Sequence, residues 1–312
     1  MYDINSFEEL RVNLMSLYEE GKYAAGLKLV EKHEPDFPEK AARTTFWKMC
    51  LLSLEGRLDD ALSTFRQGLD DGMWWAETQF IDTDLDHLRD LHEFKELVAR
   101  SVQAWEQGRK QIERDHLLLM PDAPPSRPYP LMIVLHGRHG DKETNLEQWE
   151  VARRLGWAIL SAQSTQPLYR GAYHWDDPVM GVQDILFYLE HTLEANPIDR
   201  ERIVIGGFSQ GSGMAIYAAL SGSLPVRGFI ASATWWPDVE SLAALASHTK
   251  NLRGYFVCGE KDYTLDRARE IQMVLQQNKI PYTEEFHPGL GHVFPPDFET
   301  SFKSALEFIF KE

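Results

Sequence analysis

The chain has 312 residues, of which 43% are hydrophobic, and a formal net charge of −16 at pH 7. That hydrophobic content is typical of a folded protein and excludes a disordered chain. The acidic balance disfavours nucleic acid and anionic lipid as partners, because both are negatively charged. Since no apolar run could cross a bilayer and no signal peptide is present, we expect a cytoplasmic protein without a membrane span. Cys50 and Cys258 lie in apolar stretches and are expected to be buried free thiols.

The first part of the chain has the pattern of an all-α domain. Within residues 1–115 almost nothing alternates as a strand does, whereas apolar side chains recur at helical spacing at 47–54 and again at 58–69. A more degenerate helical segment follows at about 73–112. These patterns predict helix pairs, and we place the first domain at residues 1–115.

A repeat lies within this helical part. The segment EGKYAAGLKLV at 20–30 returns as EGRLDDALSTF at 55–65, with Gly21 matching Gly56. The order glycine, bulky, small, bulky resembles the tetratricopeptide repeat, in which a turn glycine separates two antiparallel helices. An unrelated bundle of helical hairpins is the alternative. From the repeat resemblance we expect a protein partner, or self-association, through this domain.

The pattern changes at PDAPPSRPYP, residues 121–130, because five prolines in ten residues cannot continue a helix. Beyond it, short apolar runs alternate with amphipathic helices. This alternation predicts an α/β domain over residues 116–312, with a mostly parallel central sheet covered on both faces. Strands are expected at 131–135, 157–161, 202–205, 228–232, 254–258 and 282–287, and helices at 144–155, 178–195, 210–221, 240–247, 265–278 and 298–311.

The segment Gly207-Phe208-Ser209-Gln210-Gly211 fits G-x-S-x-G at a predicted strand-to-helix turn. Such a turn strains the central residue and exposes its hydroxyl, so Ser209 is the candidate nucleophile. The amide of Gln210, at the start of the helix, is a candidate donor to an oxyanion. Ser212 is expected to cap the helix with its hydroxyl. A glycine turn with an incidental serine is the alternative.

A serine hydroxyl needs a general base, because it is a weak nucleophile at neutral pH. His292 lies between two glycines in the loop after the last predicted strand, and we favour it over His287, which ends that strand. Loops at the carboxyl end of a parallel sheet converge, so His292 can reach Ser209.

The base in turn needs a carboxylate to orient it. Asp262 follows the predicted strand 254–258, and we favour it over Glu260 and Asp266. The order Ser209, Asp262, His292 is nucleophile, acid and base, as in α/β-hydrolases. A solvated loop is the alternative explanation for Asp262.

The predicted strand 131–135 leads into His136-Gly137-Arg138. Gly137 permits close backbone approach, so the amide of Arg138 is the expected second oxyanion donor. We expect His136 to position the loop rather than to act as a base. No metal is expected, because the eleven histidines form no HExxH pattern.

Residues 121–312 resemble the phospholipase/carboxylesterase group of α/β-hydrolases, which includes acyl-protein thioesterases. The resemblance implies an α/β-hydrolase fold and a cofactor-free esterase with Ser209, Asp262 and His292 as its triad. Many members have a short Leu-Gly-Asp segment after the His-Gly pair, where this chain has Arg138-His139-Gly140-Asp141. The matching segments are LHGRHGD at 135–141, AQSTQP at 162–167, YHWDDP at 173–178, GGFSQGSGMA at 206–215, GEKD at 259–262 and GLGH at 289–292.

Four further residues are expected to line a substrate pocket, because they follow predicted strands or lie in long loops on the same side. These residues are Gln163, Trp175, Trp235 and Trp236. Trp235 and Trp236 would form an aromatic wall over the acyl or alcohol site. The alternative is that they pack a loop onto the core.

Together these features predict a serine carboxylesterase that hydrolyses small to medium acyl esters, including thioesters, as small-molecule substrates. One alternative is a serine peptidase or acyl-peptide hydrolase, because helical modules often gate such sites. The other is a protein-binding repeat scaffold that carries an inactive hydrolase domain; the complete candidate triad argues against it.

Overall fold

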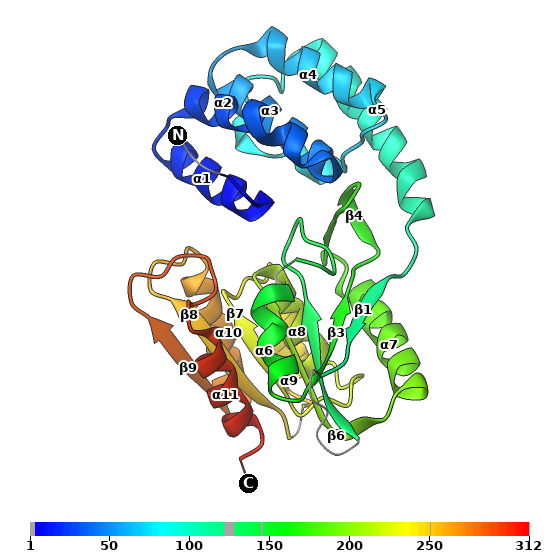
Figure 1. Cartoon of the computed structure of the whole chain (residues 1–312), viewed down its shortest axis with the longest axis vertical. Helices are drawn as coiled ribbons and strands as arrows, with labels where there is room; N and C mark the ends of the chain where they lie inside the picture. Colours follow the sequence, from blue (N-terminus) through cyan, green and yellow to red (C-terminus); the bar gives the residue numbers. More distant parts are fainter. Residues whose placement is uncertain (1–3, 122–127, 145, 250, 312) are drawn as a thin grey trace. The chain divides into compact units, whose positions relative to one another are not determined.

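The computed structural model describes residues 4–121, 128–144, 146–249 and 251–311. Most of the proline-rich stretch predicted at 121–130 lies outside these residues, since 122–127 are not described. The chain forms two compact units, both drawn in Figure 1. The first consists of Met1–Ile112 and Pro167–Ala172, and the second of Glu113–Gln166 and Tyr173–Glu312.

The first unit is built from antiparallel helix pairs. The glycines matched in the sequence, Gly21 and Gly56, both lie in turns between paired helices, with φ of 67° and 72°. Left-handed φ suits glycine, which has no Cβ to clash. Its α-helices are α1 (Phe7–Glu19), α2 (Tyr23–His33), α3 (Ala41–Leu54), α4 (Leu58–Asp70) and α5 (His92–Gly108). Its 3-10 helices are η1 (Glu34–Asp36), η2 (Pro38–Lys40), η3 (Glu77–Gln79), η4 (Thr83–Leu85) and η5 (Arg109–Gln111).

The core of the helical unit contains residues from a distant part of the chain. Strands β4 (Gln166–Tyr169) and β5 (Ala172–His174) form a two-stranded sheet. Leu168, at 0% exposure, belongs to the same apolar cluster as the helices, and its carbonyl accepts a 2.6 Å hydrogen bond from the amide of Ala76. The indole of Trp105 donates to the Pro167 carbonyl at 2.7 Å. The helical unit is therefore made of two separate stretches of sequence.

A seven-stranded sheet forms the centre of the second unit, in the order β1-β3-β2-β6-β7-β8-β9. All neighbours are parallel except β1, which pairs antiparallel with β3 at the edge. The strands are β1 (His116–Leu119), β2 (Tyr129–Leu135), β3 (Ala158–Ala162), β6 (Ile198–Phe208), β7 (Gly228–Ser232), β8 (Arg253–Gly259) and β9 (Tyr282–His287).

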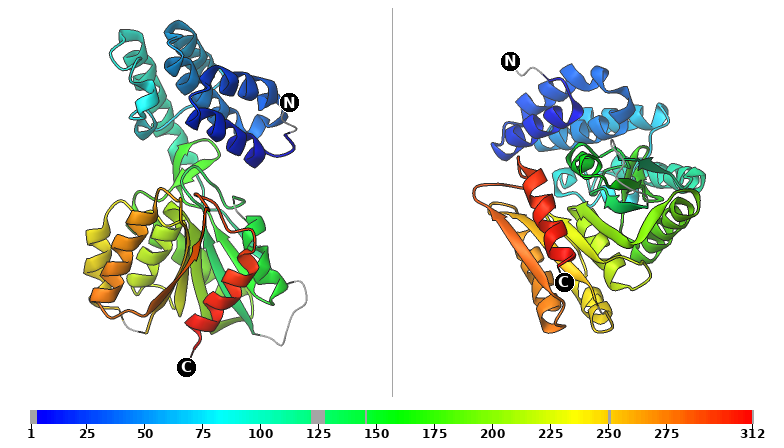
Figure 2. Two further views of the ribbon diagram at one scale, coloured as in Figure 1. Left: turned by 90° about the vertical axis from the view of Figure 1, so that its left-hand side faces the viewer. Right: turned by 60° about the horizontal axis from the view of Figure 1, so that its bottom comes forward.

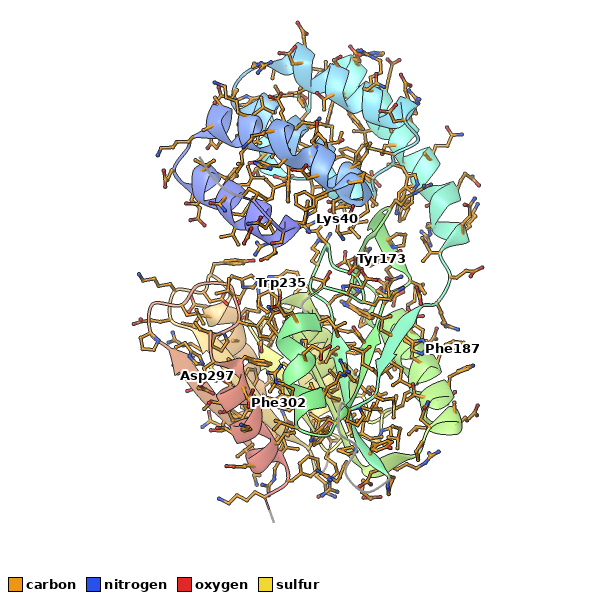
Figure 3. The ribbon with its side chains drawn as sticks, in the orientation of Figure 1. Lys40, Tyr173, Phe187, Trp235, Asp297 and Phe302 are labelled. Carbon is orange, nitrogen blue, oxygen red and sulfur yellow. The ribbon has the colours of Figure 1, made fainter. Side chains whose placement is uncertain are left out.

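Helices cover both faces of this sheet, as Figures 1 and 2 show. One face packs against α6 and α11, with Phe302 of α11 fully buried (Figure 3). The other face packs against α7 to α10. The predicted α/β-hydrolase fold with a mostly parallel sheet is thus confirmed. The helices are α6 (Leu146–Arg154), α7 (Pro178–Ala195), α8 (Gln210–Leu220), α9 (Val239–Ala246), α10 (Leu265–Gln277) and α11 (Phe298–Ile309).

The parallel strands bring distant loops together at one edge of the sheet. The loops after β2, β6, β8 and β9 leave from this carboxyl edge, where α/β proteins bind their ligands. Both cysteines are buried free thiols, as the sequence predicted. Among the described residues, no helix has the length and apolar character needed to cross a membrane.

Candidate active site

The turn between β6 and α8 holds Ser209 in a strained conformation. Its φ is 54° and its ψ is −122°, outside the regions that non-glycine residues favour. The flanking glycines allow the turn to close. A Cβ at Gly207 would lie 2.4 Å from the Gly211 carbonyl oxygen, and one at Gly211 would lie 2.3 Å from that of His136. The sequence therefore combines a strained serine with two positions at which any side chain would collide with backbone.

Backbone hydrogen bonds hold this turn in place. The amide of Ser209 donates to the Ser232 carbonyl at 3.0 Å, and its carbonyl accepts from the amide of Trp235 at 3.2 Å. The expectation that Ser212 caps α8 is wrong. The N-cap position is Ser209, and the Ser212 hydroxyl lies buried within the helix, without a hydrogen-bond partner among the described residues.

A histidine and a carboxylate meet in the loops after β9 and β8. The Nδ1 atom of His292 lies 2.9 Å from Oδ1 and 3.1 Å from Oδ2 of Asp262. The histidine side chain is 18% exposed and the carboxylate 2%. Nδ1 therefore carries a proton directed at the carboxylate, which leaves Nε2 as the basic atom of the ring.

Asp262 is fixed by its own loop. Its Oδ1 atom accepts hydrogen bonds of 2.8 Å from both the amide and the hydroxyl of Thr264. Burial raises the pKa of Asp262, but the hydrogen bonds from His292 and Thr264 outweigh it and lower the pKa below its usual value. The carboxylate is thus ionised at neutral pH and can stabilise a positive charge on the imidazole.

The rival residues make other contacts. His287 Nε2 lies 3.0 Å from Oε1 of Glu285. Glu260 accepts a 2.9 Å hydrogen bond from the amide of Gly289, while the side chain of Asp266 is 95% exposed. The structure thus pairs His292 with Asp262 and with neither of the other carboxylates.

Ring contacts place His292 beside the turn between β6 and α8. The Phe208 ring, one residue before Ser209, lies 4.8 Å from the imidazole between centroids, and Tyr263 lies 4.5 Å from it. The hydrogen bonds of the described residues do not include one from the Ser209 hydroxyl to His292. Catalytic hydrogen bonds of this kind often tighten only when substrate binds.

The loop after β2 lies against the same serine. A Cβ placed on Gly137 would be 3.5 Å from Cβ of Ser209. Neither the amide of Arg138 nor that of Gln210 donates a hydrogen bond to any atom of the described residues. Two free amide donors therefore come from the segments on either side of the serine, as an oxyanion site requires.

His136 is buried and holds this loop. Its Nδ1 lies 2.8 Å from the Gly137 carbonyl, and its Nε2 accepts from the amide of Ser164 at 3.2 Å. These partners require a neutral ring with the proton on Nδ1. Burial lowers the pKa of His136 to about 4, so the ring is neutral at physiological pH.

Comparison with known proteins agrees with this geometry. Residues 181–311 match the family described as Phospholipase/Carboxylesterase, and residues 7–109 match one described as A/B hydrolase-like, N-terminal domain. The match to the phospholipase/carboxylesterase model lies within the second unit. This family is of the esterase and thioesterase type of serine hydrolase. The more specific tetratricopeptide resemblance of the first unit stays a prediction.

Individual proteins are similar to this chain in sequence or in fold. A stretch of 71 residues is 38% identical to acyl-protein thioesterase 1 of Mycosarcoma maydis, covering 22% of this chain but only 30% of that protein. An uncharacterized protein from Bacillus cereus ATCC 10987 shares the fold over 98% of this chain and 99% of its own, with 23% identity and a TM-score of 0.55. An S-formylglutathione hydrolase from Agrobacterium tumefaciens covers 63% of this chain and 90% of its own, with 15% identity and a TM-score of 0.52.

The predicted pocket residues of the second unit differ in burial. Trp175 and Trp236 are 0% and 2% exposed within the core, which favours the alternative that they pack the loops. Trp235 is partly exposed at the edge of the sheet where the strands end (Figure 3). Gln163 is 8% exposed and its carbonyl accepts from the Tyr188 hydroxyl at 2.9 Å. Trp235 therefore has the ring surface best placed to meet a ligand.

Sequence reasoning did not single out three residues that surround the candidate site. Phe208 and Tyr263 pack on His292, and Asp176 contacts Arg138 and Gln210. Phe208 and Tyr263 are neighbours in sequence of Ser209 and Asp262, and this adjacency was the available signal. Asp176 lies in the quoted YHWDDP segment, but nothing in that segment indicates where its carboxylate points.

One group of potential metal ligands is found among the described residues, and it lies in the helical unit. It consists of Cys50, Asp82 and Asp84. Burial, followed by the charge of Asp82, raises the pKa of the Cys50 thiol well above its usual value, so the sulfur keeps its proton. Asp84 already accepts a 2.7 Å hydrogen bond from the Tyr18 hydroxyl. The Tyr18 hydroxyl therefore already occupies one oxygen of this group.

Proposed function

We propose that this protein is a serine carboxylesterase that hydrolyses small to medium acyl esters or thioesters through an acyl-enzyme intermediate. The observation that carries the proposal is the 2.9 Å contact between His292 Nδ1 and the buried carboxylate of Asp262, in loops adjoining the strained Ser209. In this proposal Ser209 is the nucleophile, His292 the general base and Asp262 the orienting acid.

The first half of the reaction acylates the serine. His292 Nε2 takes the hydroxyl proton while the Ser209 oxygen forms a bond to the substrate carbonyl carbon, and the carbonyl electrons move onto its oxygen. The amides of Arg138 and Gln210 donate to that oxyanion. When the tetrahedral intermediate collapses, the alcohol or thiol leaves with the proton from His292.

The second half releases the acid. Water replaces the leaving group, gives a proton to His292 and attacks the acyl carbon, so that the Ser209 oxygen leaves and recovers a proton from the imidazole. Asp262 stabilises the imidazolium in both halves and keeps the proton on Nδ1. The cycle needs no cofactor.

The relatives guide the choice of substrate class. The names acyl-protein thioesterase and S-formylglutathione hydrolase describe proteins that cleave thioesters. The partly exposed Trp235 offers an apolar surface beside the carboxyl edge of the sheet, which favours substrates with an aliphatic acyl or aromatic alcohol part. Gln163 is kept as a polar pocket residue in this proposal.

The decisive experiment compares the wild type with Ser209→Ala on para-nitrophenyl esters of graded chain length, on an acyl thioester and on peptide anilides. We expect ester and thioester turnover by the wild type and a loss of at least about 10³-fold in kcat in the variant. Ser223→Ala, in the loop after α8, is a matched control with an expected wild-type rate.

Two results would contradict the proposal. Equal rates for wild type and Ser209→Ala would exclude the nucleophile. Cleavage of peptide anilides without any turnover of esters would favour the peptidase instead.

We propose a helical domain at residues 1–115 and a catalytic domain at 116–312, with the segment Pro167–Ala172 of the latter contributing to the compact helical unit. The helical unit contains a polar cavity of about 670 Å³ between α2, α3 and α4, whose lining includes Thr44, Lys48 and Asp60. We propose this unit as the site of protein or self-association. Light scattering coupled to size-exclusion chromatography tests self-association directly. A monomeric result would exclude self-association and leave binding of a different protein as the proposal.

A further inference from the structure

The segment His174–Asp176, which begins at the last residue of β5 and precedes α7, contacts both sides of the candidate oxyanion site. The inference drawn from it rests on the proposed function, because it concerns how the two oxyanion amides are held. The donors come from different parts of the chain: Arg138 follows β2, and Gln210 begins α8. Since both amides must point at the same oxygen, a connection between their segments affects catalysis.

On one side the segment holds the side chain of Gln210. The amide of Trp175 donates to Gln210 Oε1 at 3.1 Å, and Gln210 Nε2 donates to Asp176 Oδ1 at 2.6 Å. Gln210 is only 1% exposed, so its amide group has little access to water. Losing one partner would leave a buried polar group unsatisfied, which costs about 1–3 kcal/mol.

On the other side the segment holds the loop after β2. Arg138 Nη1 donates to Asp176 Oδ1 at 2.7 Å and to Oδ2 at 3.0 Å. The indole of Trp175 donates to the His136 carbonyl at 2.9 Å. The same two residues therefore contact Gln210 and the loop that carries Arg138.

The chemistry of the carboxylate suits this double contact. One oxygen of Asp176 accepts from both Gln210 and Arg138, and the other also lies 2.9 Å from Nδ1 of His174. Burial raises the pKa of Asp176, but the hydrogen bond and charge of His174 and the charge of Arg138 lower it by more, so it is ionised. An amide or a hydroxyl has one acceptor oxygen, so it could not bind Arg138 through two oxygens while it also accepts from Gln210.

We propose that Asp176 is a positioning residue for the oxyanion site: its carboxylate links the side chains of Arg138 and Gln210 and so fixes the distance between their backbone amides. Asp176 does not itself touch the reacting atoms. Asp176 stabilises the transition state, in which the oxyanion forms, and has little effect on the binding of the ground-state ester.

The test is Asp176→Asn in the full-length chain. We expect kcat on a para-nitrophenyl ester to fall about 10- to 100-fold with KM within about 2-fold of the wild-type value, because displaced donors cost rate rather than binding. We also expect faster amide hydrogen exchange in segments 136–140 and 210–214 only. Arg138→Met removes the same link. The variant that combines Asp176→Asn with Arg138→Met should therefore show a fall in kcat no larger than that of the more impaired single variant.

The matched control is Asp177→Asn, which removes the same charge one residue later. Asp177 accepts from the amides of Val179 and Met180 at the start of α7, and asparagine caps a helix equally well. We expect wild-type kcat and wild-type exchange for this control.

The outcomes separate this inference from the proposed function. If the wild type hydrolyses no ester or thioester, the proposed function fails, and the exchange of the two segments alone decides whether Asp176 links them. Three results for Asp176→Asn would each overturn the proposal. They are an unchanged kcat in an active enzyme, unchanged amide hydrogen exchange in the two segments, and faster amide hydrogen exchange throughout the second unit.

Discussion

Asp262 and His292 come from different loops, so their contact is the most specific feature of the site at the scale of single residues. We predict that Asp262→Asn lowers kcat about 10³- to 10⁴-fold, because asparagine cannot keep the proton on Nδ1 of His292 or stabilise its positive charge. Steady-state kinetics on a para-nitrophenyl ester measure the effect. Asp266→Asn, at the exposed start of α10, should retain wild-type activity; equal losses in both variants would contradict the assignment.

The buried His136 gives a prediction about pH. Its folded-state pKa of about 4 lies below the unfolded value of about 6.5. Its neutral form therefore supports folding fully above pH 6.5, and this support is lost as the pH falls toward 4, because the unfolded chain takes up the proton first. Between pH 7 and pH 5 we expect His136 to account for a fall of about 2 kcal/mol in the free energy of unfolding.

Urea denaturation at the two pH values measures this effect. His136→Gln should be less stable than the wild type at pH 7, since it loses packing and a hydrogen bond, but its stability should fall less between pH 7 and pH 5. His248→Gln, at an exposed position, should keep the wild-type dependence. An equal fall in wild type and His136→Gln would show that His136 is not buried as a neutral ring.

Single residues differ in how well the sequence predicts them. Ser209, His292 and Asp262 follow from strand ends and chain order, because parallel strands bring their carboxyl ends together whatever the details. The burial of Trp175 and Trp236 does not follow, since a loop aromatic can face a ligand or the core. The role proposed for Asp176 could not be predicted either, because it depends on the contact of its side chain with those of Arg138 and Gln210.

At the scale of elements, the turn from β6 into α8 depends on close backbone contact. We predict that Gly211→Ala lowers kcat by at least about 10-fold and destabilises the protein by about 2–4 kcal/mol, because its Cβ would lie 2.3 Å from the His136 carbonyl oxygen. Kinetics and urea denaturation measure the two effects.

The opposite end of the same helix supplies the control. Gly222 follows α8 with φ of 69°, and the space that a Cβ would occupy there is open. Gly222→Ala should cost only about 1 kcal/mol of left-handed strain and leave kcat unchanged. A Gly211→Ala variant no worse than Gly222→Ala would mean that the turn can open without loss.

Most elements of the sheet were predictable because their strands contain continuous apolar runs, while β9 shows an alternating pattern, and the observed bounds differ from the predicted ones by a few residues. Strands β4 and β5 were not predicted. They are short, and Leu168 is buried by helices from elsewhere in the sequence rather than by a repeating pattern of its own. Local periodicity cannot reveal burial of that kind.

At the scale of the whole molecule, the stability of the helical unit depends on residues from the second half of the sequence, namely Pro167–Ala172. We predict that Leu168→Ala destabilises the helical unit by about 2–4 kcal/mol, as expected for a fully buried leucine. Hydrogen exchange should become faster in α3, α4 and α5 and stay unchanged in β6 and β7. Val179→Ala, at 58% exposure, should change neither; general acceleration in Leu168→Ala would contradict a local role.

The discontinuous helical unit also imposes an order on synthesis at the ribosome. When residue 112 emerges, the five helices are complete, but the places filled by Leu168 and Tyr169 are still empty. Strands β2 and β3 are made before those residues arrive, and β6 to β9 come afterwards. The unit that is translated first therefore finishes its core only when more than half of the chain has been made, and a nascent chain stopped before Pro167 exposes apolar surface that the full-length protein hides.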